Sequence, residues 1–306
     1  MNIFIDETFF NPNLMEQFKN EFPNFTLLLD PMDYAKIDIL IASPKMIQKN
    51  IIDQMPNLKF IKLLTAGYDT VDLAYVKQKH IPIAYAKDVF SIQIAEDVFA
   101  KILYFNRKLG SYHELSKNHA WTFVPSRHEI YGQTVLILGA GSIGNEIAVR
   151  MKAFGATVIG YKKRPLQDHL YDAMVYDMIH LKQVLRITDY VIVCLSLSKE
   201  TYHFVNEDFL QSMHKDALLI NIARGDIIDQ QALIDALNKD IIRGAALDVT
   251  SPEPLLPTDP LWQAKNIFIT PHQASSSPMM KKRLMNEVME TMKNYIEGNP
   301  LSNLIP

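Results

Sequence analysis

The sequence has little cysteine, no strong charge of either sign and no long hydrophobic run. A single cysteine, Cys194, cannot form an intramolecular disulfide, and the chain has no cysteine cluster that would suggest a metal site. Because Cys194 stands in the apolar run YVIVCL, we expect a buried structural thiol. The formal net charge of -3 over 306 residues provides no field that would hold nucleic acid or anionic lipid.

Membrane signals are lacking as well. No apolar run approaches the roughly 20 residues of a membrane-spanning helix, and the N-terminal stretch MNIFIDETFF has no basic region before its apolar residues. We therefore expect a cytoplasmic protein with no membrane partner. The composition, 48% hydrophobic and 21% charged, is that of a globular protein, and the length suggests two domains of about 150 residues each.

Short apolar runs rich in Ile, Val and Leu recur along the chain and do not alternate with polar residues. This pattern is typical of parallel strands that are covered on both faces. Helical patterns such as 142–154 and 229–239 lie between the runs, so we predict an α/β protein with doubly wound parallel sheets. The predicted strands are 2–6, 25–29, 38–42, 58–64, 81–86, 134–139, 157–161, 190–196, 217–223, 244–249 and 266–270.

Two longer helical patterns, 92–109 and 278–298, flank the second set of predicted strands. They would suit a pair of connectors between an outer domain and an inserted inner one. On this interpretation the outer domain consists of residues 1–96 and 275–306, and the inner domain of residues 97–274.

The segment TVLILGAGSIGNEIAVR carries the spacing G-x-G-x-x-G at Gly139, Gly141 and Gly144. It follows an apolar run, opens an amphipathic helical pattern, and is followed by a second apolar run, TVIGY. In that context the spacing predicts a dinucleotide-binding turn. Gly139 permits the tight turn, Gly141 lets the backbone approach the diphosphate, and Gly144 lets helix and strand pack closely. The N–H groups near Ser142 and Ile143 would hold the diphosphate charge.

Three cations, Lys162, Lys163 and Arg164, follow the second strand of this motif. An NAD site places Asp or Glu there to accept hydrogen bonds from the ribose 2′-OH. A carboxylate would repel a 2′-phosphate, whereas the three cations would neutralise it. We therefore expect NADP(H) as the cofactor. The alternative is that the cations only solvate an exposed turn and that the protein uses NAD(H).

Further polar residues follow predicted strands in the second half of the inner domain. Arg224 stands in NIARGD, Asp248 and Glu253 in ALDVTSPEPL, and His272 in ITPHQAS. Since ligands of open α/β sheets bind outside the carboxyl ends of the strands, these segments are candidates for a site.

Six segments stand in a recognisable order along the chain: TAGYDTVD, SIQIAED, GAGSIG, NIARGDIID, GAALDVTSPEPL and TPHQAS. Taken together, they resemble the D-isomer-specific 2-hydroxyacid dehydrogenase family, which includes D-lactate dehydrogenases, glyoxylate/hydroxypyruvate reductases and phosphoglycerate dehydrogenases. The resemblance implies a Rossmann dinucleotide-binding domain inserted into a flavodoxin-like substrate-binding domain, with the active site between them. It also implies a homodimer formed through the inner domain and residues 119–132.

The resemblance also implies roles for three catalytic residues. Arg224 matches the arginine that binds the substrate carboxylate and 2-oxo group, for which a planar guanidinium is suited. His272 matches the general acid/base that exchanges a proton with the substrate oxygen. Glu253 matches the carboxylate paired with that histidine, which favours the protonated ring and fixes its tautomer.

Other matched residues bind rather than react. Asp248 matches the aspartate near the nicotinamide carboxamide, and Ala66 and Gly67 match the loop whose backbone N–H groups meet the substrate carboxylate. Alternatively, Gly67 serves only a backbone conformation. The segment 84–88, Ala-Tyr-Ala-Lys-Asp, departs from the Asn-x-Pro-Gly that the family carries there. The substrate of a known family member is therefore not assigned to this chain.

We predict an oxidoreductase that transfers a hydride between NADP(H) and a small 2-oxo acid or D-2-hydroxy acid, in the reductive direction. One alternative is an NAD-linked dehydrogenase of the phosphoglycerate type. Another is a non-catalytic, dinucleotide-sensing binding protein, because a fold alone does not fix a function. The expected partners are the small-molecule acid and a second copy of the chain. Trp121 and His119 belong either to a partner's site or to a core or interface.

Overall fold

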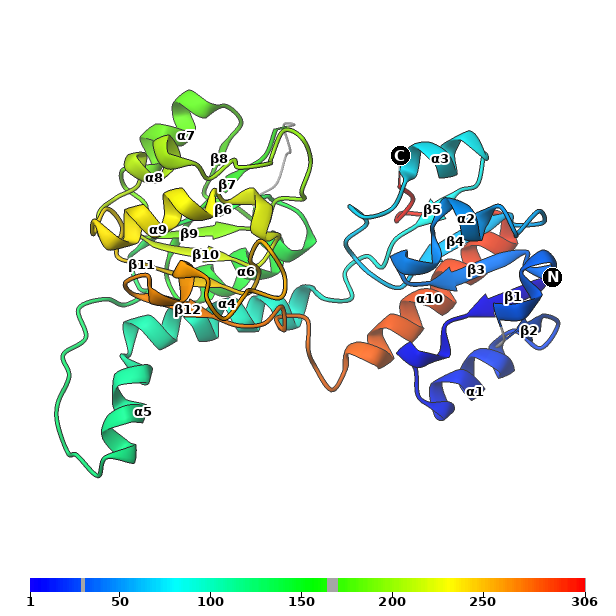
Figure 1. Cartoon of the computed structure of the whole chain (residues 1–306), viewed down its shortest axis with the longest axis horizontal. Coiled ribbons are helices and arrows are strands. Elements are labelled where there is room, and N and C mark those ends of the chain that lie inside the picture. Colours follow the sequence, from blue (N-terminus) through cyan, green and yellow to red (C-terminus); the bar gives the residue numbers. More distant parts are fainter. Residues whose placement is uncertain (29–30, 164–169, 306) are drawn as a thin grey trace. The chain divides into compact units, whose positions relative to one another are not determined.

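The structure is a computed structural model that describes residues 1–28, 31–163 and 170–305, without the side chains of residues 31–33. The chain forms two compact units (Figure 1). Unit 1 comprises Met1–Phe90 and Ser277–Pro306, and unit 2 comprises Ser91–Ser276. The predicted boundary between residues 96 and 97 falls inside a helix that begins at Ser91, whereas the compact units divide before that helix.

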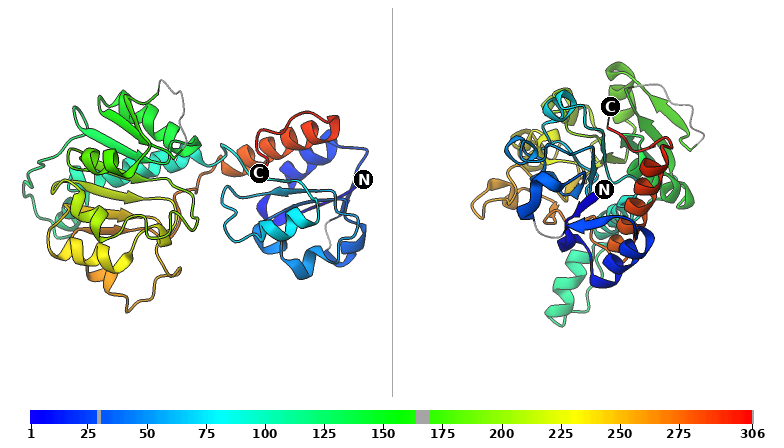
Figure 2. Two further views of the ribbon diagram at one scale, coloured as in Figure 1. Left: turned by 90° about the horizontal axis from the view of Figure 1, so that it is seen from above. Right: turned by 90° about the vertical axis from the view of Figure 1, so that its right-hand side faces the viewer.

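Unit 1 contains a five-stranded parallel sheet in the order β2-β1-β3-β4-β5, the flavodoxin-like order. Both chain termini lie in this unit (Figure 2). The strands are β1 (Asn2–Ile5), β2 (Thr26–Leu28), β3 (Ile39–Ala42), β4 (Phe60–Leu63) and β5 (Ile83–Ala84). The α-helices are α1 (Pro12–Glu21), α2 (Lys49–Ile52), α3 (Leu73–Gln78) and α10 (Met280–Glu297), and the 3-10 helices are η1 (Glu7–Phe9), η2 (Pro31–Lys36) and η3 (Pro44–Met46).

Each face of the unit 1 sheet is covered. Buried residues of α1 and α10 pack on one face, and buried residues of α2 and α3 pack on the other. α10 is therefore joined to the first 90 residues by a shared core, although it lies almost 200 positions further along the chain. Burial of both faces explains why the strand sequences are apolar throughout rather than alternating.

Unit 2 contains a seven-stranded parallel sheet in the order β12-β11-β10-β9-β6-β7-β8. The strand order reverses between β6 and β9, as in a dinucleotide-binding Rossmann sheet. The strands are β6 (Thr134–Leu138), β7 (Thr157–Tyr161), β8 (Ala173–Val175), β9 (Tyr190–Val193), β10 (Leu218–Asn221), β11 (Gly244–Leu247) and β12 (Ile267–Ile269). The helices are α4 (Ser91–Asn106), α5 (Leu109–Lys117), α6 (Ser142–Ala153), α7 (Met178–Leu185), α8 (Glu207–Ser212), α9 (Gln230–Asn238), η4 (Gly225–Ile227) and η5 (Pro260–Gln263).

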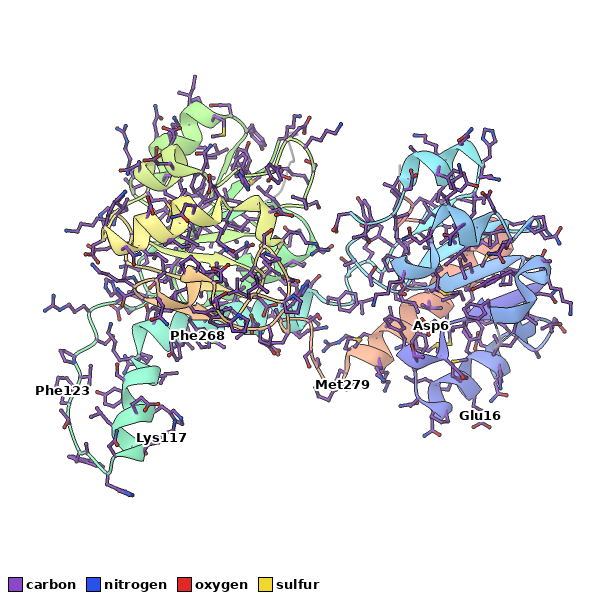
Figure 3. The ribbon with its side chains drawn as sticks, viewed as in Figure 1. Asp6, Glu16, Lys117, Phe123, Phe268 and Met279 are labelled. Carbon is purple, nitrogen blue, oxygen red and sulfur yellow. The ribbon has the colours of Figure 1, made fainter. Side chains whose placement is uncertain are left out.

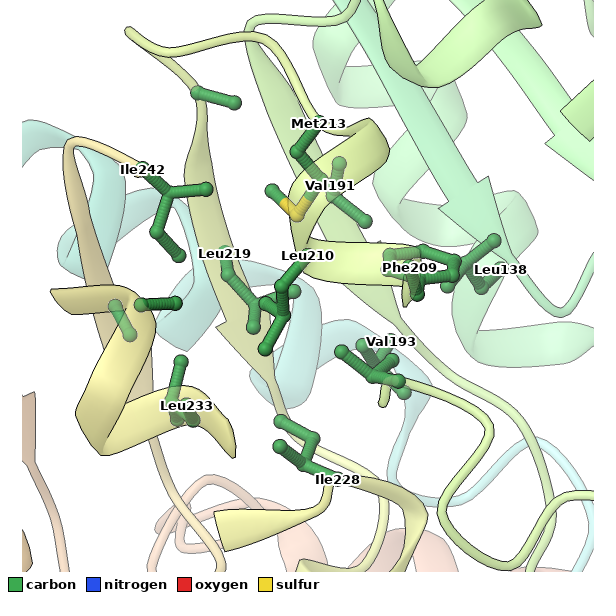
Figure 4. Close-up of a cluster of buried hydrophobic side chains, with 14 of the residues drawn as sticks. Leu138, Val191, Val193, Phe209, Leu210, Met213, Leu219, Ile228, Leu233 and Ile242 are labelled. Carbon is green, nitrogen blue, oxygen red and sulfur yellow. The ribbon is translucent and has the colours of Figure 1, made fainter. Parts of the chain in front are cut away.

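The sheet of unit 2 also has helices on both faces. α7, α8 and α9 bury side chains such as Phe209, Leu210 and Leu233 against Leu138, Val191 and other strand residues (Figure 4). α4 and α6 pack against each other outside this cluster. The prediction of two doubly wound parallel sheets is thus confirmed. Among the residues that the structure describes, no helix is both long and apolar enough to cross a bilayer.

Two elements of unit 2 were not predicted. The three-residue strand β8 lies at the sheet edge with only Val175 buried, so its sequence lacks the apolar run of an inner strand. The predicted helix 92–109 is shorter, because α4 ends at Asn106 and Lys108 adopts a left-handed conformation with φ +54°. A separate helix, α5, then follows.

Residues 109–131, called the arm below, project from the rest of unit 2 (Figure 1). In Figure 3, Phe123 and Lys117 lie on this projection, away from Phe268 on β12. The two halves of the arm are joined because the hydroxyl of Tyr112 donates to the carbonyl of Val124 at 3.0 Å and accepts from its N–H at 3.0 Å.

Large apolar side chains are exposed on the arm. Trp121 is fully exposed and Phe123 is 83% exposed. The base of the arm is fixed by buried polar contacts, since Tyr190 accepts from the amide of Asn106 at 2.7 Å and donates to the carbonyl of Glu129 at 2.7 Å.

Candidate active site

The glycine turn of the fingerprint follows β6 and leads into α6. Gly139 has φ +108°, and a Cβ there would lie 2.7 Å from the carbonyl oxygen of Cys194, which follows β9. A Cβ at Gly144 would lie 2.4 Å from the carbonyl oxygen of Gly139. The turn is therefore closely packed at the point where the strand order reverses. Residue Cys194 is half-buried, and the protein around its thiol raises the pKa of that thiol, so it is not a reactive nucleophile.

The turn leaves room for a dinucleotide. A Cβ at Gly141 would meet nothing within 4 Å, so this glycine faces open space. Gly141 is also the N-cap of α6, and no side chain of the described residues caps the helix. The first N–H groups of α6, at Ser142 and Ile143, can therefore bind an anion, and the helix dipole favours negative charge there. These features fit the diphosphate of a bound dinucleotide.

The cations that follow β7 differ in their contacts. The half-buried Lys162 donates from Nζ to the carbonyl oxygen of Ala140 in the glycine turn at 3.2 Å. Lys163 is exposed and forms an ion pair of 2.9 Å with Glu200. The Lys163 ammonium holds the pKa of the Glu200 carboxyl below its ordinary value. Arg164 lies outside the described residues.

Arg224 follows β10 in a turn that a buried amide shapes. The side chain of Asn221 accepts from the N–H of Ala223 at 3.0 Å and donates to the carbonyl of Arg224 at 2.9 Å. The guanidinium of Arg224 donates to the carbonyl of Ala223 at 2.7 Å. Asn221 was not predicted, although its place at the end of an apolar strand was a signal that could have found it.

The loops after β10 and β11 are packed directly together. A Cβ at Gly225 would lie 2.1 Å from the carbonyl carbon and oxygen of Thr250. The hydroxyl of Ser251 donates to the carboxylate of Asp226 at 2.5 Å. The positions of Arg224 and of the loop that carries Glu253 are therefore linked.

His272 and Glu253 form a pair across two loops. Nδ1 of His272 lies 2.8 Å from Oε2 of Glu253. Because an ionised carboxylate only accepts hydrogen bonds, Nδ1 donates, and Nε2 is left as the ring atom that can exchange a proton. Oε1 of Glu253 accepts from the N–H of Thr250 at 3.1 Å, which orients the carboxylate. The His272 side chain is 49% exposed and thus accessible to a substrate.

The turn that carries His272 is built around Asp248, which is 2% exposed. One carboxylate oxygen accepts from the hydroxyl of Thr270 at 2.6 Å and from the N–H of Gln273 at 3.1 Å. The other accepts from the N–H of Ala274 at 2.8 Å. The carbonyl of Asp248 accepts from the N–H of His272 at 2.7 Å. The side chain of Asp248 therefore faces into the protein and organises the turn.

The structure brings Arg224, Asp248, Glu253 and His272 together at the carboxyl ends of β10, β11 and β12. Ala66 and Gly67 follow β4 in unit 1. There the hydroxyl of Thr65 donates to the carbonyl of Gly67 at 2.8 Å, and the carbonyl of Thr65 accepts from the N–H of Ala86 at 3.0 Å. The loop of Gly67 is thus tied to the segment 84–88.

A parallel sheet with an open glycine turn at its switch point, and an imidazole–carboxylate pair in the loops after β11 and β12, points to the class of dinucleotide-dependent oxidoreductases. Residues 99–274 match the model of the NAD binding domain of D-isomer specific 2-hydroxyacid dehydrogenases. The chain belongs to this D-isomer specific 2-hydroxyacid dehydrogenase family.

Three similar proteins illustrate the relationship. The glyoxylate reductase/hydroxypyruvate reductase of Homo sapiens is 33% identical over 83% of this chain and 79% of that protein. The glyoxylate reductase of Korarchaeum cryptofilum is 29% identical over 87% of this chain and 81% of that protein. Among solved structures, an acyclic imino acid reductase in complex with NADPH and D-Arg is 26% identical, with a TM-score of 0.88 and coverage of 100% of both chains.

The close packing at Gly225 generates a test of the linked loops. Gly225→Ala would force the backbone of Thr250 to move, so we expect a loss of about 1–3 kcal/mol in the free energy of unfolding and a lower Tm. The matched control is Gly141→Ala, whose Cβ has free space: Tm should stay at the wild-type value while dinucleotide binding weakens. Thermal unfolding gives the Tm of each variant, and fluorescence titration gives its dinucleotide affinity. A wild-type Tm for Gly225→Ala would contradict the packing.

Proposed function

We propose that the protein reduces a small 2-oxo acid to the D-2-hydroxy acid with NADPH. The observation that carries the proposal is the 2.8 Å contact between His272 and Glu253, on loops joined to the turn of Arg224. A carboxylate that holds Nδ1 prepares the imidazole for proton exchange at Nε2, which is the chemistry a carbonyl reduction needs. The nicotinamide, when bound, supplies the hydride.

The residues of the proposed reaction have separate tasks. The guanidinium of Arg224 binds the substrate carboxylate, and the backbone N–H groups of Ala66 and Gly67 are assigned to the same carboxylate by the resemblance to the family. His272 gives a proton to the carbonyl oxygen as negative charge develops there. Glu253 stabilises the imidazolium before transfer and keeps the ring in place afterwards.

The same proposal assigns the cofactor contacts. The diphosphate lies against the turn Gly139–Gly144, including the N–H groups of Ser142 and Ile143. The Asp248 carboxylate, which was predicted to lie near the nicotinamide carboxamide, is buried and faces into the protein, so its proposed part is to hold the His272 turn that meets the nicotinamide. Lys162, with Lys163 and Arg164, neutralises the 2′-phosphate.

Two observations support NADPH over NADH. The residue after β7 is Lys162 rather than an acid, and its ammonium already lies against the glycine turn. The imino acid reductase of the same fold was solved with NADPH. The Glu200 carboxylate, which pairs with Lys163, would repel a 2′-phosphate. We therefore assign the preference for NADPH to Lys162.

A second candidate function is reduction of a 2-imino acid, which the likeness to the imino acid reductase over 100% of both chains favours. An amine condenses with the 2-oxo acid and releases water, and hydride then reduces the C=N bond instead of C=O. Adding methylamine to the assay separates the two, because an imine reductase would form the N-methyl amino acid. An NAD-linked oxidative enzyme and a non-catalytic dinucleotide sensor stay as alternatives, and the His272–Glu253 pair favours catalysis over the latter.

We further propose that the protein is a homodimer in which the arm covers a second copy of the chain. Trp121 and Phe123 are exposed on an arm whose base is fixed by Tyr190, which suits a preformed contact surface. Exposed aromatic side chains on a projecting segment are otherwise unfavourable in water.

His272→Ala removes the proton donor, so turnover should fall by at least about 100-fold. The matched variant Glu253→Gln keeps an oxygen that accepts from Nδ1 but removes the charge, so its loss should be smaller. The consumption of NADPH and NADH with glyoxylate, hydroxypyruvate and pyruvate is followed by absorbance. Near-normal turnover of His272→Ala would refute its role, and a wild-type protein inactive on every 2-oxo acid would refute the reaction.

Lys162→Asp introduces the acid of an NAD site and repels a 2′-phosphate. Since a hydrogen bond to a charged group contributes about 1.5–3 kcal/mol, the ratio of kcat/KM with NADPH to kcat/KM with NADH should fall by about tenfold or more. The control is Lys163→Asp, whose lysine pairs with Glu200, and its effect should be smaller. An unchanged ratio in Lys162→Asp would mean that this cation does not read the 2′-phosphate.

Trp121→Glu combined with Phe123→Glu should convert the dimer to a monomer, because two carboxylates would be buried in the contact. Sedimentation velocity of the wild type and the variant gives the masses. Ile179→Glu, which changes a side chain 74% exposed on α7, is the control and should leave the dimer intact. A monomeric wild type, or a variant that stays dimeric, would contradict the proposed contact.

A further inference from the structure

α4 carries three polar side chains on one face, at positions i, i+4 and i+8. They are Gln93, Asp97 and Lys101, and residues with this spacing lie above one another along a helix. Gln93 is 4% exposed and Lys101 is 1% exposed. The rest of the buried surface of α4 is largely apolar. The three residues therefore form a polar stripe along the largely apolar buried face of α4, with Gln93 and Lys101 buried and Asp97 partly exposed.

Each residue of the stripe contacts the turn of His272 or the aspartate beneath it. The amide of Gln93 donates to the carbonyl of Ser275 at 3.2 Å. Asp97 accepts from the side-chain amide of Gln273 at 2.7 Å. The ammonium of Lys101 forms an ion pair with Asp97 and lies 3.7 Å from the carboxylate of Asp248.

Burial of an ammonium costs desolvation free energy, and only close carboxylates compensate this cost. An apolar side chain of similar size often stabilises a fold as well or better. Lys101 is thus weak evidence for stability alone. Its contact with Asp248 instead connects α4 to a carboxylate that accepts hydrogen bonds from Thr270, Gln273 and Ala274.

The His272 turn needs such support. His272 has φ +49°, a left-handed conformation that costs free energy in a residue with a Cβ. The N–H groups of Gln273 and Ala274 are held by the Asp248 carboxylate, and Oδ1, the oxygen that accepts from Gln273, also lies 3.7 Å from the Lys101 ammonium. A substitution at Lys101 would therefore affect the position of the His272 imidazole through one intervening residue, Asp248.

We propose that Gln93, Asp97 and Lys101 are positioning residues that hold the His272 turn in its reactive geometry through Asp248. This inference rests on the proposed role of His272 as the proton donor. Lys101 is too buried to touch a substrate, so it acts only through Asp248. The ordering of the turn sets the orientation of the imidazole, on which the rate of proton transfer depends.

The experiment compares Lys101→Met with Lys101→Met/Asp97→Leu in the full chain. Lys101→Met leaves two carboxylates without their cation, so Tm falls, and kcat falls by about tenfold or more because the imidazole is misplaced. KM for the 2-oxo acid changes less than kcat, since Arg224 is untouched. The double variant removes the unpaired Asp97 charge and recovers much of the Tm, whereas kcat stays low because positions 97 and 101 of α4 no longer hold Asp248 and Gln273.

A readout independent of activity follows the turn itself. Hydrogen–deuterium exchange of the peptide covering 270–276 should become faster in both variants. Arg243→Met is the matched control: Arg243 is a partly buried cation that also contacts α4, donating to the side-chain oxygen of Asn106 at 3.1 Å, but it precedes β11 whereas Asp248 follows that strand. This control should lower Tm and leave the exchange of 270–276 and kcat close to the wild-type values.

The outcomes separate this inference from the proposed function. If kcat recovers together with Tm in the double variant, or if Lys101→Met has wild-type kcat and wild-type exchange at 270–276, the positioning role is overturned. If the wild type reduces no 2-oxo acid, the proposed function fails. The exchange of 270–276 then still decides whether Lys101 orders the turn.

Discussion

A carboxylate that is buried at the end of a strand must be matched by donors on every side, and the site of unit 2 is arranged around one such group. Asp248 accepts from Thr270, Gln273 and Ala274 and faces the ammonium of Lys101. Leaving any buried charge without these partners would cost several kcal/mol. The loops that meet at Asp248 are therefore held in one arrangement, and His272 is part of that arrangement.

The parallel sheet explains why these residues meet. β10, β11 and β12 are neighbours, so their carboxyl ends, followed by Arg224, Asp248 and His272, lie along one edge. Close contact between the loops then fixes their spacing, because Gly225 leaves no room for a side chain against Thr250. The strand order thus brings Arg224, Asp248 and His272 to one edge of the sheet, and the contact between the loops fixes their orientation.

Much of this arrangement was predictable because the residues follow local rules. All eleven predicted strands are present, since strands buried on both faces are apolar throughout. Arg224, Glu253 and His272 were singled out by their places after such strands, and their roles stay predictions. The edge strand β8 was missed because little of it is buried. The link between Lys101 and Asp248 was missed for another reason: helical spacing places Asp97 and Lys101 on one face, but a pattern does not say what that face packs against 147 positions further along the chain.

Two acidic groups contact the turn of His272, Asp248 through the backbone of that turn and Glu253 through the ring, and their different burial has a chemical consequence. Asp248 is 2% exposed, whereas the side chain of Glu253 is 38% exposed. In water the attraction between Glu253 and an imidazolium is weak, but it strengthens as a bound substrate and cofactor displace solvent. The buried group can therefore hold the turn constantly, while the exposed group acts most strongly in the complex that reacts. In the proposed reaction, a site built in this way would keep its geometry before the substrate binds and develop its electrostatic effect when the proton is transferred.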